Sequence, residues 1–129
     1  IKFCRKSGYV SNIFGRKSHF ININDKNFNV RNFQERAAIN APIQGSASEI
    51  MRLAMIRLNK RLQEQKNIKT KMLLQIHDEL SFETTKEEVK RISKIIIEEM
   101  SSVANSDLHS FSIPLTVDLN IGDNWGALH

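Results

Sequence analysis

Two adjacent carboxylates, Asp78 and Glu79, interrupt an otherwise apolar stretch of the chain. Apolar residues alternate on both sides of this pair, with Leu74 and Ile76 before it and Leu80 and Phe82 after it. Such alternation predicts two short half-buried strands, and the only break between them covers residues 77–79. We therefore expect the carboxylates at or beside the tip of a hairpin, although the tip lacks the Asn-Gly or Gly-Gly pair of the usual two-residue turns.

Two negative charges on a tight bend repel each other and add nothing to the stability of the fold. A divalent cation removes this repulsion, because Mg²⁺ binds carboxylate oxygens together with the phosphates of a substrate. The alternative is a solvated turn that is acidic and carries no chemistry. The stretch taken alone leaves both interpretations open.

A second group of polar side chains consists of Arg36, Asn40 and Gln44, which recur at steps of four residues. On a helix such residues drift by only about 40° per step, so they form one row. Asn and Gln offer both donors and acceptors, and Arg offers a fork of donors. The row suits contacts to phosphate, sugar or minor-groove acceptors of a nucleic acid, and the alternative is an ordinary exposed helix face.

The composition, with 40% hydrophobic and 26% charged residues, is typical of a globular protein. The length of 129 residues corresponds to one domain or part of one. The single cysteine, Cys4, excludes an intramolecular disulfide and suits a reducing compartment. No apolar run approaches the length of a membrane span, so we expect no membrane partner.

Charge is distributed unevenly along the chain. Residues 1–36 carry eight Lys and Arg against two acidic residues, and residues 37–77 carry seven against two. Residues 78–129 carry four against ten. A polyanion is attracted to the first 77 residues, and cations are attracted to the rest.

The first half of the chain predicts a small hairpin and a long helix. The hairpin is expected between Gly8 and Gly15 with its turn at Ser11 and Asn12, followed by Arg16 and Lys17 on a surface loop and an irregular, Asn-rich stretch over residues 21–32. The helix is expected over residues 33–65, with a kink or break at Pro42 and Gly45. Its buried stripe is expected to contain Ile50, Met51, Ala54, Met55, Leu58 and Leu62.

The second half predicts a helix packed on the carboxylate hairpin. A capping box, Thr85-x-x-Glu88, is expected to start this helix. Its apolar face contains Val89, Ile92, Ile96, Met100 and Val103. A loop over residues 105–110 and a last strand over residues 115–121 complete an α+β fold, in which an antiparallel sheet bears the carboxylate hairpin and helices pack on one face.

Two blocks of this sequence resemble the family A DNA polymerases, the bacterial DNA polymerase I family. Residues 35–47 read Glu-Arg-Ala-Ala-Ile-Asn-Ala-Pro-Ile-Gln-Gly-Ser-Ala, and residues 75–80 read Gln-Ile-His-Asp-Glu-Leu. The Gly-Tyr-Val at residues 8–10, the Gly-Arg at 15–16 and the Asn-Trp at 124–125 fit the same pattern in the same order. The resemblance covers nearly the whole chain.

The resemblance implies the palm subdomain of a DNA-directed DNA polymerase that acts in replication and repair in the cytoplasm of a bacterial-type cell, at the nucleoid. Its implied partners are primer–template DNA, deoxynucleoside triphosphates and the rest of the polymerase chain. In this family the Asp of the His-Asp-Glu motif is a ligand of two catalytic Mg²⁺ ions, and that position is Asp78. The adjacent acid, Glu79, is implied as a supporting catalytic and metal-binding residue.

The same resemblance assigns DNA contacts. Arg36, Asn40 and Gln44 correspond to residues that contact the primer–template near the primer 3′ end, and His77 is implied to lie close to the primer terminus. Arg31 is a further DNA-binding candidate.

Two elements of the family are absent from these 129 residues. One is the first carboxylate motif, Asp-Tyr-Ser-Gln-Ile-Glu, and the other is the fingers helix that holds the incoming nucleotide. We therefore expect residues 1–129 to form the C-terminal portion of a polymerase domain that is inactive by itself.

Two other functions each match part of the sequence. An ATPase that uses residues 73–79 as a Walker B strand also needs a Gly-Lys phosphate loop, and the chain contains no Gly-Lys pair. A non-catalytic, basic nucleic-acid-binding module explains the charge distribution but not the acidic hairpin.

Overall fold

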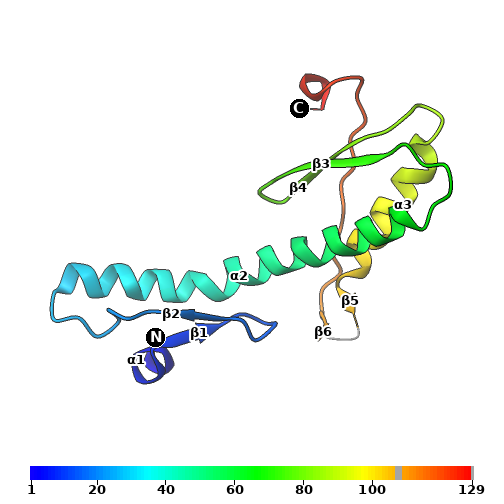
Figure 1. Ribbon diagram of the computed structural model, residues 1–129. Coiled ribbons are helices and arrows are strands. Elements are labelled where there is room, and N and C mark those ends of the chain that lie inside the picture. Colours follow the sequence, from blue (N-terminus) through cyan, green and yellow to red (C-terminus); the bar gives the residue numbers. More distant parts are fainter. Residues whose placement is uncertain (107–108, 129) are drawn as a thin grey trace. The chain divides into compact units, whose positions relative to one another are not determined.

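The computed structural model describes residues 1–106 and 109–128, and it contains two compact units, Ile1–Met51 and Arg52–His129. Its helices are α1 Lys2–Ser7, α2 Phe28–Gln63, α3 Val89–Ser102 and the short 3₁₀ helix Trp125–Ala127 (Figure 1). Its strands are β1 Tyr9–Ser11, β2 Lys17–His19, β3 Lys71–Ile76, β4 Glu79–Glu83, β5 Asn105–Ser106 and β6 His109–Ser110. The strands form three antiparallel pairs, β1–β2, β3–β4 and β5–β6, so the predicted α+β class is confirmed.

Helix α2 begins five residues earlier than expected, at Phe28. The side-chain oxygen of Asp25 accepts a hydrogen bond of 2.7 Å from the Asn27 amide. The Asn27 side chain in turn accepts one of 2.9 Å from the Asn29 amide, and its carbonyl accepts one from Arg31. Short polar side chains of this kind satisfy the unpaired amides of a first helical turn, so the irregular prediction is wrong from Phe28 onward.

The break expected at Pro42 is absent, because α2 continues through Pro42 and Gly45. Proline removes the amide that would bond to the Ala38 carbonyl. The helix nevertheless has local support at this place. This support is tertiary packing, because Ala38 is buried in the core of the first unit. The Ser46 hydroxyl donates to the Pro42 carbonyl at 2.6 Å, a bond to residue i−4 that tends to bend a helix rather than to stabilise it.

The first unit is built around a small buried cluster. Cys4, Ile23 and Ala38 form it, and Val10 and Phe20 pack against it. Strand β1 pairs with β2 in the register Tyr9↔His19, so five residues, 12–16, connect the strands. The two-residue turn expected at Ser11 and Asn12 is therefore wrong, and Lys17 lies in β2 rather than on a loop.

The core of the second unit lies between α2, α3 and the β3–β4 hairpin (Figure 1). Its buried residues are Leu58, Leu62, Ile92, Ile95 and Ile96, and Met72, Leu80, Phe82, Met100 and Leu119 are among the half-buried residues that pack against them. These residues include members of both predicted helix stripes. The expected packing of helices on one face of the hairpin is confirmed.

Three details after β4 differ from expectation. Glu88 is the N-cap residue of α3, but its side chain makes no cap hydrogen bond, so the capping box is wrong. The predicted loop over residues 105–110 contains the β5–β6 pair, and residues 107–108 lie outside the described residues. Residues 115–121 alternate in burial as far as Asn120 but are not a strand, because no described segment pairs with their backbone.

None of the helices among the described residues combines the length and the apolarity that crossing a membrane requires.

Candidate functional site

The carboxylates lie at the tip of the β3–β4 hairpin, as the alternation predicted. Ile76 pairs with Glu79, so the connection consists of His77 and Asp78, and Glu79 is the first residue of β4. The three-residue break expected over 77–79 is thus one residue too long. His77 has a φ of 51°, in the left-handed region that tight hairpin turns require and that His tolerates better than most residues.

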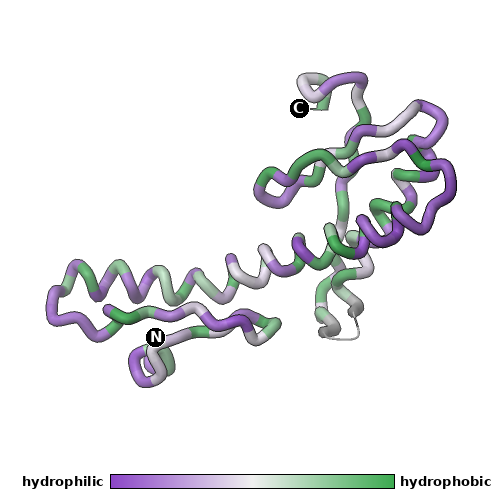
Figure 2. Tube along the Cα trace, in the orientation of Figure 1, coloured by the Kyte–Doolittle hydropathy of each residue, from purple (hydrophilic) through white to green (hydrophobic). Residues whose placement is uncertain are grey.

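The hairpin is anchored by one face and free at its tip. Met72, Leu80 and Phe82 pack against the core of the second unit. By contrast, residues 75–79 are all exposed, and Figure 2 shows the tip as a hydrophilic segment next to apolar strand residues. A β-bulge between Met72 and Leu74 shifts the register within the anchored part. The fold therefore presents Asp78 and Glu79 away from the buried core.

Neither carboxylate at the tip is used by the fold itself. Within residues 1–106 and 109–128, no hydrogen bond or ion pair involves the side chain of Asp78 or Glu79. The same residues contain no group of three or more His, Cys, Asp or Glu side chains that could enclose a metal ion. One or two carboxylates completed by water and substrate phosphates is the usual ligand set of Mg²⁺, so this donor pair fits such an ion.

The predicted polar row lies on α2, within the first unit. Arg36, Asn40 and Gln44 are all exposed. Ile39 and Ile43, one position before Asn40 and Gln44, are also exposed, at 53% and 72%. The row is therefore open to a ligand along its length.

Arg31 differs from the row because the fold already uses part of its side chain. One guanidinium nitrogen donates to the Asp25 carbonyl at 3.0 Å. The guanidinium carbon lies 5.6 Å from the centroid of the Phe28 ring. Arg31 is half-buried, so it has fewer donors available for a ligand than the exposed Arg36.

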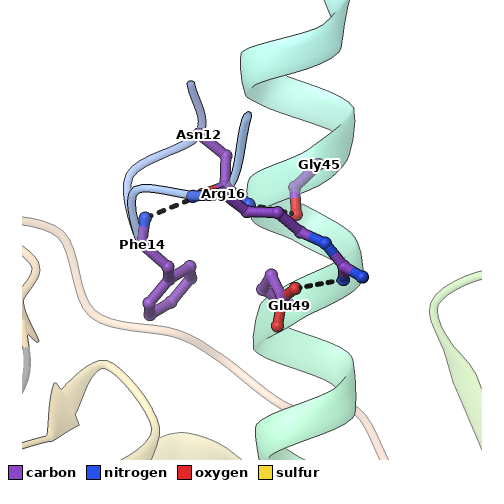
Figure 3. Close-up of polar contacts among 5 residues, drawn as sticks. All are labelled: Asn12, Phe14, Arg16, Gly45 and Glu49. Atoms are coloured by element: carbon purple, nitrogen blue, oxygen red, sulfur yellow. Dashed lines mark hydrogen bonds and ion pairs between the residues drawn. The ribbon is translucent and has the colours of Figure 1, made fainter. Parts of the chain in front are cut away.

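A network that sequence reasoning missed fixes the β1–β2 loop onto α2 (Figure 3). The Arg16 guanidinium donates to the Glu49 carboxylate at 2.6 Å, and the side-chain nitrogen of Asn12 donates to the Gly45 carbonyl at 3.2 Å. The Asn12 oxygen accepts from the backbone amides of Phe14 and Arg16 at 3.0 and 2.9 Å, which shapes the loop. The loop thus contacts the helical turn that follows Gln44. The Gly-Arg pair at residues 15–16 was the only sequence signal for it.

The sequence model of the family described as DNA polymerase family A matches residues 1–127. The chain therefore belongs to DNA polymerase family A, and the resemblance found in its motifs is confirmed.

Two bacterial DNA polymerases I are similar to the chain over nearly its whole length. The chain is 40% identical over 125 residues to DNA polymerase I of Bacillus caldotenax. The matched region covers 97% of this chain and 14% of that protein. It is 42% identical over 125 residues to DNA polymerase I of Streptococcus pneumoniae serotype 4, with the same coverage. It thus spans about a seventh of the length of these relatives.

A solved structure is similar to the chain in fold as well as in sequence. It is the POL domain of Pol1 from M. smegmatis in complex with DNA primer–template and dNTP. The two match with a TM-score of 0.89 and 35% identity, over 98% of this chain and 21% of that one.

Proposed function

We propose that this chain is the C-terminal portion of the polymerase domain of a longer, template-directed DNA polymerase and contributes the carboxylate hairpin of its palm. One observation carries this proposal. The carboxylates Asp78 and Glu79, which the fold does not use, lie at the exposed tip of a hairpin whose strands pack against the core, in a chain of DNA polymerase family A. The M. smegmatis relative, solved with primer–template and dNTP, supports the proposed substrates.

In this proposal Asp78 holds the catalytic divalent ions and Glu79 supports it. When bound, two Mg²⁺ ions supply the positive charge that activates the primer 3′-hydroxyl and stabilises the leaving pyrophosphate. The further carboxylates that such chemistry needs come from the rest of the polymerase. The cellular setting that we propose is DNA replication and repair in the cytoplasm.

The proposed DNA contacts come from α2 and from the hairpin tip. Arg36 binds a backbone phosphate, because an exposed guanidinium offers a fork of donors to phosphate oxygens. Asn40 and Gln44 bind sugar or minor-groove atoms, and Arg31 adds a phosphate contact through the nitrogens that Asp25 does not use. His77 lies at the primer terminus, next to Asp78.

We expect Gln44→Ala in the complete polymerase to slow primer extension, most strongly past a mismatched primer end. The amide of Gln44 donates to minor-groove acceptors that all correctly paired ends share, so the loss shows little dependence on sequence. Steady-state extension from matched and mismatched primers measures it. Gln63→Ala is the matched control, because Gln63 is an exposed glutamine at the C-terminal end of α2, whereas Gln44 lies in the middle of the helix.

We expect Arg36→Ala to weaken binding of primer–template and to reduce the slope of log affinity against log salt concentration by about one unit, the contribution of one phosphate contact. Fluorescence anisotropy at several salt concentrations measures this slope. Normal binding and extension by the Arg36, Asn40 and Gln44 alanine variants together would show that the row is only a solvated helix face.

The 129-residue chain by itself should bind DNA weakly and extend no primer. Its first 77 residues carry fifteen Lys and Arg against four acidic residues, which predicts sequence-independent affinity of about 10⁻⁴ to 10⁻⁶ M that falls steeply with salt. Primer extension with Mg²⁺ and all four nucleotides is the assay. An Asp78→Ala variant of the chain, purified in the same way, is the control for contamination. Primer extension by the 129-residue chain that this variant lacks would show that the chain contains a complete site.

A further inference from the structure

Glu88, the residue that sequence reasoning placed in a capping box, binds the start of the hairpin instead of its own helix. Both carboxylate oxygens of Glu88 accept a hydrogen bond from the backbone amide of Lys69, Oε1 at 3.0 Å and Oε2 at 3.2 Å. The carboxylate also accepts the Thr70 hydroxyl at 2.7 Å. The Thr70 and Thr84 hydroxyl oxygens lie 2.7 Å apart, and because Thr70 donates to Glu88, Thr84 donates to Thr70.

These contacts close the base of the carboxylate hairpin. Lys71 and Glu83 form the outermost strand pair, and Thr70 and Thr84 are the residues just outside it. Thr70 is only 8% exposed, so its hydroxyl depends on protein partners. Glu88 directly precedes α3, so the chain of hydrogen bonds joins both strand ends to the start of this helix.

The charge of Glu88 is suited to this task. The hydrogen bond from the Thr70 hydroxyl, followed by the one from the Lys69 amide, lowers the pKa of the Glu88 carboxyl below its ordinary value. The carboxylate form is the one that accepts all of these donors, and hydrogen bonds to a charged acceptor are stronger than neutral ones.

The position of the tip depends on this base together with the core contacts of Met72, Leu80 and Phe82, of which only Leu80 lies next to the tip. An isolated two-stranded hairpin is marginally stable, and residues 75–79 make no part of the buried core. A strand of six residues such as β3 is about 20 Å long, so a tilt of about 5° at the base moves the tip by about 2 Å. Misplacing a catalytic group by about 1 Å can lower a rate about a hundredfold.

We propose that Glu88 is a positioning residue for the carboxylate hairpin, which ties the strand ends at Thr70 and Thr84 to α3 and thereby fixes where Asp78 lies. This inference rests on the proposed function, since it concerns the placement of the proposed metal-binding residue. Glu88 itself touches no substrate.

The test is Glu88→Gln in the complete polymerase, with Glu87→Gln as the matched control. Both variants remove one negative charge at neighbouring positions, but Glu87 is exposed and makes no hydrogen bond or ion pair to any described residue. Glutamine keeps the shape of Glu88 and offers one acceptor oxygen in place of two. We expect Glu88→Gln to lower the single-turnover incorporation rate at saturating nucleotide at least about tenfold, with the KM for nucleotide and the Kd for primer–template unchanged.

Two further variants separate positioning from mere stability. Thr84→Val removes the donor to Thr70 and should lower the single-turnover incorporation rate. Thr70→Ser keeps the hydroxyl and should retain nearly the wild-type rate. If Glu88→Gln and Glu87→Gln have equal incorporation rates, even with a lower melting temperature for Glu88→Gln, then Glu88 only stabilises the fold and the inference is overturned.

The failure of this inference can be told apart from failure of the proposed function. An inactive Asp78→Asn enzyme together with a normal Glu88→Gln enzyme contradicts only the positioning role. A normal Asp78→Asn enzyme contradicts the proposed function, and the positioning role is then overturned with it.

Discussion

Replacing Asp78 by Asn in the complete polymerase is expected to lower nucleotide incorporation at least about a thousandfold while leaving primer–template affinity nearly unchanged. Catalytic metal ions contribute several kcal/mol to transition-state stabilisation, and each ~1.4 kcal/mol is tenfold in rate. Asparagine keeps the size of the side chain but loses the charge that the proposed ions require. Because Asp78 is exposed and unused by the fold, its replacement removes no hydrogen bond or ion pair formed with any described residue.

Two other acidic residues on the same hairpin make this result specific. Glu79→Gln should cause a smaller loss, since Glu79 is proposed to support Asp78 rather than to bridge both ions. Glu83→Gln removes an exposed charge at the far end of β4 and should leave the rate unchanged. Single-turnover incorporation on a matched primer measures all three. A rate for Asp78→Asn equal to that of Glu83→Gln would leave the non-catalytic nucleic-acid-binding module as the better interpretation.

Leu58→Ala is expected to have the largest effect on stability, about 3 kcal/mol, because it leaves a cavity in a packed core. Leu58 is 0% exposed and belongs to the cluster on which Met72, Leu80 and Phe82 of the hairpin rest. Hydrogen exchange of the β3 amides reports the stability of this platform locally. A loss of 3 kcal/mol should accelerate their exchange by about a hundredfold.

Ile56→Ala is the matched control on the same helix, since Ile56 is 57% exposed. The β3 amides of the Ile56→Ala variant should exchange as slowly as those of the wild-type protein. Equal exchange rates in the Leu58 and Ile56 variants would mean that the hairpin does not depend on the core formed with α2 and α3.

The parts of the fold that sequence reasoning recovered are those in which burial imposes a period. Alternation around Asp78 and Glu79 predicted the hairpin, and Leu80 and Phe82 of β4 pack against the core as expected. In β3 the alternation placed Leu74 and Ile76 on the buried face, but a bulge lies between Met72 and Leu74, Met72 packs against the core instead, and Ile76 is exposed. The i, i+4 spacing of Ile50, Ala54 and Leu58 predicted the buried stripe of α2, in which Ala54 and Leu58 are buried and Ile50 is half-buried. Periodicity reports the buried face where the element is regular, and it fails where a bulge shifts the register.

The parts that it missed depend on partners distant in sequence. Thr85-x-x-Glu88 has the spacing of a capping box, but the Glu88 carboxylate finds Lys69 and Thr70 instead, eighteen or nineteen residues away. Residues 115–121 have the alternation of a strand, yet a strand also needs a hydrogen-bonded neighbour, which the described residues do not supply. Local patterns contain no information on such pairings.

The candidate site divides along the same line. The motif His77-Asp78-Glu79 and the row on α2 could be found from residue types and spacing. The contact of Arg16 with Glu49 could not, because it joins residues that are thirty-three positions apart.

Whether the hairpin tip binds the metal ions is measured by binding of Mn²⁺, as a paramagnetic substitute for Mg²⁺, to the complete polymerase with primer–template and nucleotide bound. Electron paramagnetic resonance gives the number of bound ions and their affinities in the wild-type protein and in the Asp78→Asn and Glu83→Gln variants. We expect Asp78→Asn to lose at least one bound ion or to bind it at least about tenfold more weakly, because a charged ligand is removed. Glu83→Gln should bind as the wild type does. Equal stoichiometry and affinity in all three proteins would contradict the assignment of the hairpin tip as the metal site.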